Sequence, residues 1–145
     1  MKLVVGITGS TGVIYGIRLL EILKRLNIET HLVMSQWAEK CISMETNHDL
    51  NYVKSLATES SDEANMASSI SSGTHKTDGM IVIPCSMKTL SSVANGYDET
   101  LVARASGVML KESRKLILVV RETPLTAINL ENMLKLARLG VVILP

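Results

Sequence analysis

Short, almost continuously apolar segments alternate along this chain with longer segments in which apolar residues recur every three or four positions. Continuous apolar runs are typical of strands buried on both faces, and the helical spacing is typical of helices that pack one face on a sheet. The expected strands cover residues 3–7, 30–34, 80–84, 116–120 and 141–144. The expected helices cover residues 13–26, 36–44, 50–57, 87–94, 100–110 and 130–139, and Ser35 is the expected N-cap of the second.

This alternation of strands and helices predicts an α/β fold with a mainly parallel sheet that is covered on both faces. The polar middle of the chain adds no strand to this expectation. We expect a turn or a short helix over residues 61–65 and a Ser/Gly-rich loop over residues 67–77. Because no linker, repeat or low-complexity tract divides the 145 residues, a single domain is expected.

The composition of the chain says less about the fold than about which classes of function are excluded. Hydrophobic residues make up 46% of the chain and aromatic residues 3%, with no Phe, so an aliphatic core is expected. The net charge of +1 gives no footprint for nucleic acid or for a membrane surface, and no apolar run approaches the roughly 20 residues of a membrane span. Cys41 and Cys85 lack the spacing of a metal site and fit buried thiols in a reducing cytoplasm.

Two small, hydroxyl-rich loops directly follow apolar runs, at residues 6–12 and 83–89. Loops at the carboxyl ends of parallel strands line the ligand crevice of such a sheet. Hydroxyls and free backbone N–H groups from two loops can surround one phosphate. The pair therefore predicts a binder of a phosphorylated small molecule, although the first loop alone also fits a tight strand-to-helix turn without a ligand.

Two familiar nucleotide sites do not fit the first loop. A nicotinamide site requires G-x-G-x-x-G and an acidic residue at the end of the second strand, whereas this chain has G-x-x-G-x-x-G and ends that strand in Met34-Ser35. A P-loop requires G-K-[ST], whereas Gly12 is followed by Val13. Flavin mononucleotide (FMN) remains compatible, because its single phosphate needs only hydroxyl and N–H groups.

The two loops are part of a longer series of motifs, at residues 6–12, 30–35, 71–73, 79–90, 110–112, 121–125 and 130–133. In this order the motifs resemble the UbiX/Pad1 flavin prenyltransferases, and the resemblance runs from residue 2 to residue 145. It implies a flavodoxin-like Rossmann fold, a three-layer sandwich that is usually assembled as a homo-dodecamer. It further implies transfer of a dimethylallyl group from dimethylallyl monophosphate to reduced FMN, without a metal. The product, prenylated FMN, serves a UbiD-type decarboxylase.

The resemblance also implies roles for individual residues. The implied FMN contacts are Gly9, Ser10, Thr11, Ser35, Ser86, Met87, Lys88, Thr89 and Arg121. The implied catalytic residues are Thr11, Glu45, Arg104, Lys111 and Glu122, with Thr11 standing where the family has Ser. Cations such as Lys111 and Arg104 suit a developing phosphate charge, and Glu122 suits protonation of that leaving group. Thr11 or Glu45 would relay the proton released when the new ring closes.

Several of these residues have simpler interpretations. Lys111 also fits a solvated helix end, where cations are favourable. Glu45 also fits the end or cap of a helix. Arg121 and Glu122 follow a buried strand, where charged residues are expected simply because the chain leaves the core.

The family continues beyond the final Leu-Pro with a Pro- and aromatic-rich segment and a last helix. We therefore expect residues 1–145 to form one FMN-binding domain that lacks this segment. Two other functions stay open: an FMN-binding protein without transferase activity, and an FMN-dependent decarboxylase of the cysteine-decarboxylase type. The loop over residues 84–89 lacks the Asn of the Pro-Ala-Ser-Ala-Asn-Thr loop of those decarboxylases, which disfavours the second.

Overall fold

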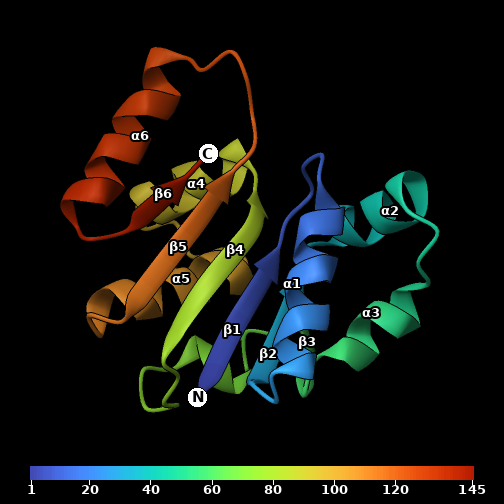
Figure 1. Cartoon of the computed structure of the whole chain (residues 1–145). Helices are drawn as coiled ribbons and strands as arrows, with labels where there is room; N and C mark the ends of the chain where they lie inside the picture. Colours follow the sequence, from blue (N-terminus) through green and yellow to red (C-terminus); the bar gives the residue numbers. More distant parts are fainter.

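A computed structural model describes all residues, 1–145, as one sheet with helices on both faces (Figure 1). The strands are β1 (Lys2–Ile7), β2 (Glu29–Met34), β3 (Glu59–Asp62), β4 (Gly79–Cys85), β5 (Lys115–Val120) and β6 (Val142–Leu144). The α-helices are α1 (Val13–Arg25), α2 (Gln36–Glu45), α3 (Leu50–Leu56), α4 (Met87–Ala94), α5 (Leu101–Lys111) and α6 (Ala127–Arg138), and a 3₁₀ turn covers Ser69–Ser71. The expected α/β class is confirmed.

All six strands are parallel, in the order β3-β2-β1-β4-β5-β6. This is the order of the dinucleotide-binding Rossmann sheet. Without the polar edge strand β3, the five remaining strands follow the flavodoxin-like order 2-1-3-4-5. The five apolar strands therefore have the expected flavodoxin-like order, and β3 adds one further strand at the edge of the sheet.

The expectation of a turn or a short helix over residues 61–65 was wrong at its start, because Glu59–Asp62 form the edge strand β3. Residues 59–62 pair in parallel with residues 31–34 of β2, and most of their side chains are exposed. An edge strand of this kind gains its hydrogen bonds from the ladder and shows no apolar pattern. A buried side-chain contact adds to the pairing, since Nε2 of His31 lies 2.8 Å from Oγ of Ser61.

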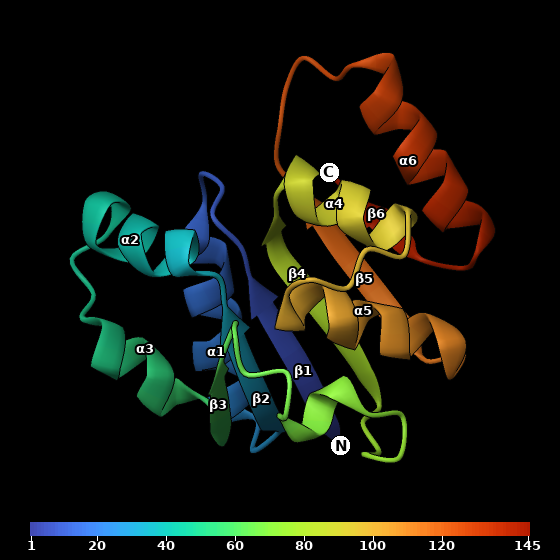
Figure 2. The ribbon, with the colours of Figure 1, turned by 180° about the vertical axis from the view of Figure 1, so that it is seen from behind.

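The core consists of two aliphatic layers, one on each face of the sheet. Alternate residues of β1 face opposite layers, so that Val5 packs with α1, α2 and α3 and Val4 packs with α4 and α5. Figure 2 shows the second face, where α4 and α5 lie on the sheet and α6 flanks α4. This packing confirms the expected core without Phe.

The order in which strands are added to the sheet reverses between β1 and β4. The chain leaves β1 toward β2 on one side and later crosses to β4 on the other, so the loops after β1 and β4 meet at the carboxyl edge. Thr8 joins them, because its buried Oγ1 donates to the Pro84 carbonyl (2.8 Å) and accepts from the Ser86 N–H (2.8 Å). The two hydroxyl-rich loops are thus held side by side.

Local capping chemistry sets several helix starts. Ser35 accepts from the N–H of Ala38 (3.0 Å), as expected, and Ser86 accepts from the N–H of Thr89 (3.2 Å). Helix α6 begins three residues before the expected start, because Thr126 and Asn129 form a capping box.

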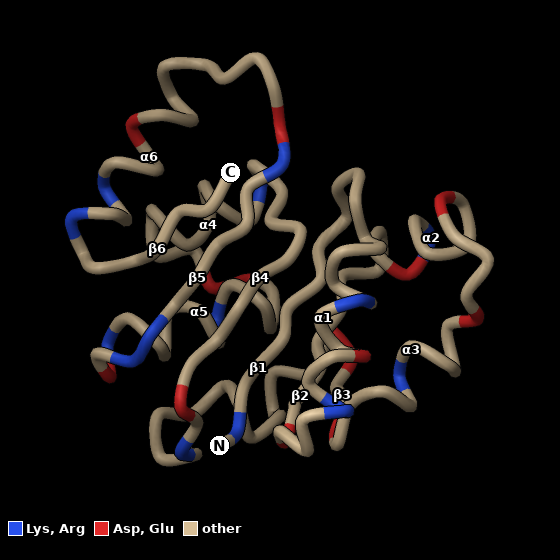
Figure 3. The backbone as a smooth tube through the Cα atoms, viewed as in Figure 1, with Lys and Arg blue, Asp and Glu red and all other residues tan.

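Charged residues are spread along the chain with both signs interspersed (Figure 3). None of the helices has both the length and the apolar character that a membrane crossing requires.

Candidate functional site

Two cavities open at the carboxyl edge of the sheet, beside the loops that follow β1, β2, β4 and β5. The larger has a volume of about 810 Å³ and is lined by Gly9, Ser10, Thr11, Trp37, Cys41, Met44, Glu45, Val120, Arg121, Glu122, Thr123, Leu125 and Pro145. The smaller has a volume of about 440 Å³ and is lined by Thr8, Gly9, Ser35, Gln36, Trp37, Lys40, Glu63, Ser86, Lys88, Thr89, Ser92 and Thr100. We call them the ring cavity and the anion cavity, after the chemistry of their linings.

Gly9 and Trp37 line both cavities and form the wall between them. The Trp37 side chain packs directly on the Gly9 backbone, so that a Cβ atom on Gly9 would lie only 2.6 Å from Cβ of Trp37. A contact this close requires glycine at position 9. The wall therefore depends on one residue without a side chain and on one large ring.

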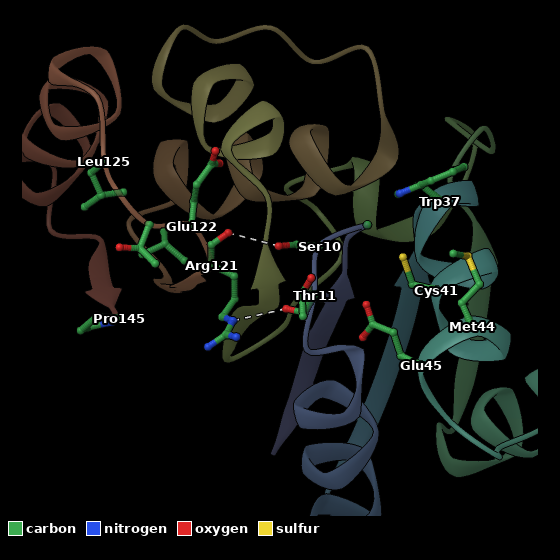
Figure 4. A pocket seen from close by; sticks show the side chains of 13 residues that line it. Ser10, Thr11, Trp37, Cys41, Met44, Glu45, Arg121, Glu122, Leu125 and Pro145 are labelled. Atoms are coloured by element: carbon green, nitrogen blue, oxygen red, sulfur yellow. Dashed lines mark hydrogen bonds between the residues drawn. The ribbon is translucent and has the colours of Figure 1, made fainter.

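Glu45 brings a carboxylate into the ring cavity (Figure 4). It is the last residue of α2, and its Oε2 accepts a hydrogen bond from the backbone N–H of Gly12 (3.0 Å), the residue that precedes α1. Helix α1 has no side-chain cap of its own. Glu45 thus supplies a negative charge at the positive end of α1. It ends α2, as expected for this position, and its side chain also connects α2 to the start of α1.

The chain after β5 forms the opposite side of the ring cavity. Nε of Arg121 donates to the Thr11 carbonyl (3.3 Å), and Oγ of Ser10 donates to the Arg121 carbonyl (3.2 Å), as the dashed lines in Figure 4 mark. Glu122 follows with an exposed side chain. One guanidinium and two carboxylates, those of Glu45 and Glu122, therefore surround this cavity.

Two helix N-termini meet at the anion cavity. Ser35 caps α2 and Ser86 caps α4, while Lys88 and Thr89 add a cation and a hydroxyl. The amino ends of helices carry partial positive charge and unpaired N–H groups, which favour a bound phosphate. Glu63 is the exception, because its Oε2 accepts from the N–H of Gln36 (3.2 Å) at the start of α2.

The residues of the two cavities fit FMN. The anion cavity offers hydroxyls and helix N-termini to a phosphate, and the ring cavity offers apolar surface from Trp37, Met44, Val120 and Leu125 to a flat ring system. Their shared wall at Gly9 places the two kinds of surface next to each other.

The two cysteines differ in their surroundings. Burial raises the pKa of the Cys85 thiol to about 12, so this group is protonated at neutral pH and is a poor nucleophile. Cys41 lines the ring cavity, where burial, aided by the charge of Glu45, also raises its thiol pKa. Neither thiol has the lowered pKa of a catalytic cysteine.

The structure brings most of the predicted site residues together. Gly9, Ser10, Thr11, Glu45, Arg121 and Glu122 line the ring cavity, and Gly9, Ser35, Ser86, Lys88 and Thr89 line the anion cavity. Met87 instead packs against the buried core beneath α4. The individual roles of these residues in FMN binding and catalysis stay predictions.

Arg104 and Lys111 line neither cavity of their own chain. Nε of Arg104 donates to the Ser71 carbonyl (3.1 Å) and Nη1 pairs with Asp98 (3.1 Å). Lys111 ends α5 near the start of β5, at the opposite edge of the sheet, where its Nζ lies 3.6 Å from Glu112. Within a single chain, the surroundings of Lys111 therefore match the simpler interpretation, that of a solvated helix end.

The motifs did not single out several lining residues. Cys41 is one of them, although its spacing of four residues from Trp37 and from the predicted Glu45 places all three on one face of α2. This spacing would have indicated a common surface. Glu63 and Thr123 carry no signal of this kind.

The sequence profile of the flavoprotein family matches residues 1–145. A probable UbiX-like flavin prenyltransferase of Escherichia coli O157:H7 is 55% identical over 146 residues, which cover 100% of this chain and 74% of that protein. The crystal structure of a dodecameric FMN-dependent UbiX-like decarboxylase from the same organism superimposes with a TM-score of 0.98 at 55% identity, over 100% of this chain and 80% of that one. The structure of AnUbiX (PadA1) in complex with FMN and dimethylallyl pyrophosphate also gives 0.98, at 51% identity, over 99% of this chain and 77% of that one.

Proposed function

This chain belongs to the flavoprotein family, among the UbiX/Pad1 flavin prenyltransferases, and we propose that its two cavities bind different parts of the substrates of that reaction. The anion cavity holds the phosphate of FMN, and the ring cavity holds the flavin ring together with the prenyl donor. The observation that carries this proposal is the shared wall of Gly9 and Trp37, which places a pair of capped helix N-termini beside an apolar cavity that contains Arg121, Glu45 and Glu122.

FMN binding rests on the residues at the carboxyl edge. Ser35, Ser86 and Thr89 offer hydroxyls at the starts of α2 and α4, and Lys88 adds a positive charge. The loop of Gly9, Ser10 and Thr11 lies against the ring cavity, where Arg121 provides further donors. The donor set is suited to an anion at one end and an apolar ring at the other.

When bound and reduced, FMN supplies the nucleophilic ring atoms to which the dimethylallyl group becomes attached. In the ring cavity, the Arg121 guanidinium stabilises anionic oxygens, and Glu122 donates a proton to the departing phosphate. Glu45 accepts a proton through its carboxylate, with the Thr11 hydroxyl as a relay. Trp37 and Leu125 limit the access of water to the reacting carbon.

Assembly and partners follow from the same proposal. We propose a homo-oligomer, of the dodecameric kind described for the Escherichia coli relative. Because Arg104 and Lys111 lie away from both cavities of their own chain, their contact with the prenyl donor would require a neighbouring copy. The donor is dimethylallyl monophosphate, no metal takes part, and the prenylated FMN passes to a UbiD-type decarboxylase. Two buried thiols, Cys41 and Cys85, fit a reducing compartment such as the cytoplasm.

The test is anaerobic incubation of the protein with FMN, dithionite and dimethylallyl monophosphate, followed by mass spectrometry of the released flavin. A mass gain of one prenyl unit is the expected result, and Glu122→Gln is expected to slow its formation without loss of FMN binding. Glu131→Gln, on the exposed face of α6, is the matched control. Unmodified FMN that stays bound to the wild-type protein would contradict the transferase and favour an FMN-binding protein.

A parallel incubation with dimethylallyl pyrophosphate distinguishes the two donors. Product from the monophosphate alone supports the proposed donor, and product from the pyrophosphate alone overturns it.

A further inference from the structure

The ring of Tyr15 lies beneath the guanidinium of Arg121, with Cζ of Arg121 5.7 Å from the ring centroid. Tyr15 is in the first turn of α1, which follows β1, whereas Arg121 directly follows β5. Because β4 separates β1 from β5 in the sheet, this contact spans the point between β1 and β4 where the strand order reverses. It therefore joins the two sides of the ring cavity.

Arg121 has few other restraints. Its Nε donates to the Thr11 carbonyl (3.3 Å), and its side chain is exposed and forms no ion pair with a carboxylate. A single hydrogen bond through Nε leaves the outer guanidinium nitrogens to bind a ligand. The aromatic ring is the second contact that limits where they point.

Gly12 provides the space for this arrangement. A Cβ atom on Gly12 would lie 3.1 Å from the Tyr15 ring and 3.5 Å from Nε of Arg121, and the residue has a φ of 104°, which favours glycine. The ring and the guanidinium therefore approach each other next to a position that carries no side chain.

We propose that Tyr15 is a positioning residue for Arg121, which holds the guanidinium at the mouth of the ring cavity so that it can bind a phosphate-bearing ligand. The inference rests on the proposed function, since it assigns the anion to FMN or to the prenyl phosphate. A ring face attracts a guanidinium within about 6 Å of its centroid and requires no hydroxyl. The aromatic ring of Tyr15, and not its oxygen, is therefore the part that acts.

The experiment compares Tyr15→Phe and Tyr15→Leu in the wild-type chain and in an Arg121→Gln background. Two quantities are measured: the Kd of FMN by flavin fluorescence, and kcat and KM for dimethylallyl monophosphate in the prenyl transfer assay. In the wild-type background Tyr15→Leu is expected to raise the Kd or the KM about two- to fivefold, the effect of an exposed cation–π contact. Tyr15→Phe is expected to stay close to wild type, and neither change should add to the effect of Arg121→Gln.

The two ligands separate the sources of the anion. A change in the Kd of FMN alone assigns the Arg121 contact to the flavin, and a change in KM alone assigns it to the prenyl phosphate. Circular dichroism and thermal melting verify that each variant is folded, and the exposed position of Tyr15 favours this.

The inference is overturned if Tyr15→Leu matches wild type in both quantities, if it has an equal effect with and without Arg121, or if Tyr15→Phe is as harmful as Tyr15→Leu. Failure of the proposed function looks different, because the wild-type chain would then form no prenylated flavin. In that case the FMN arm still tests the Tyr15 contact, and a wild-type chain that binds no FMN overturns both.

Discussion

The carboxylate of Glu45, at the end of α2, accepts a hydrogen bond from the backbone N–H of Gly12, at the start of α1, over 3.0 Å. This contact stabilises the uncapped N-terminus of α1 and also fixes a carboxylate in the ring cavity. A structural role thus coincides with the proposed chemical role in one side chain, and substitutions can separate them.

Glu45→Ala is expected to lower the free energy of unfolding by about 1 kcal/mol, the usual effect of removing a helix cap. Glu45→Gln keeps an oxygen that can accept from Gly12 and is expected to lower it less. Both substitutions remove the charge, so both should slow prenyl transfer. Urea unfolding and the prenyl transfer assay measure the two effects. Equal stability of the Ala variant and the wild type would show that the hydrogen bond does not support α1.

Gly9→Ala is expected to weaken FMN binding at least about fivefold. The new Cβ atom would overlap with the Trp37 side chain, and moving that ring costs about 1 kcal/mol or more. Fluorescence titration with FMN measures the effect. Gly107→Ala, in α5 and away from both cavities, is the matched control, because the atoms nearest to the new methyl group belong to the Asp98 side chain. Wild-type affinity in Gly9→Ala would mean that the wall between the cavities does not shape the flavin site.

Glu63→Gln is expected to tighten FMN binding about two- to fivefold. The Glu63 carboxylate occupies the N–H of Gln36 at the start of α2, where a phosphate is proposed to bind, and its charge repels that phosphate. Glutamine retains the hydrogen bond without the charge. The gain should shrink as the salt concentration rises, because screening weakens repulsion between partly exposed charges.

Glu39→Gln is the control for this change, since Glu39 is also in α2 but pairs with Lys54 and lines neither cavity. An unchanged Kd in Glu63→Gln would place the phosphate elsewhere.

Stability is expected to fall as the pH drops below about 6.5, in part because of His31. Burial lowers the pKa of this imidazole in the folded chain, Glu59 opposes the shift, and Lys2 and His75 add to it. Because the folded pKa lies below the ordinary value of about 6.5, the unfolded chain takes up a proton that the folded chain resists. The stabilising contribution of neutral His31 is therefore complete above that pH and is lost as the pH falls through it.

Urea unfolding between pH 8 and pH 5 tests this dependence, with His31→Gln as the comparison. The variant is expected to show a flatter profile over this range. The Nδ1 atom of His31 lies 3.2 Å from Oε2 of Glu59, whose negative charge favours the protonated imidazole, so this neighbour reduces the effect of burial on the pKa without cancelling it. A wild-type profile as flat as that of the variant would contradict the assignment to His31.

The apolar runs and one cap residue, Ser35, were enough to predict five strands, most helix boundaries and the meeting of two hydroxyl-rich loops. These features depend on local chemistry: the spacing of side chains that face the core, and the Ser35 hydroxyl as an acceptor for the first turn of α2. The topology of a parallel sheet then places the loops after β1 and β4 together.

Tertiary structure alone decided the rest. Strand β3 is polar and forms because the edge of β2 offers it backbone hydrogen bonds. Three further contacts each join segments that are distant along the chain or lie on different elements: Gly9 with Trp37, Glu45 with Gly12, and Tyr15 with Arg121. Likewise, Lys111 lies at the far edge of the sheet because α5 runs antiparallel to the strands. A sequence pattern specifies which face of an element is buried, whereas the partner across a cavity depends on how the finished layers pack.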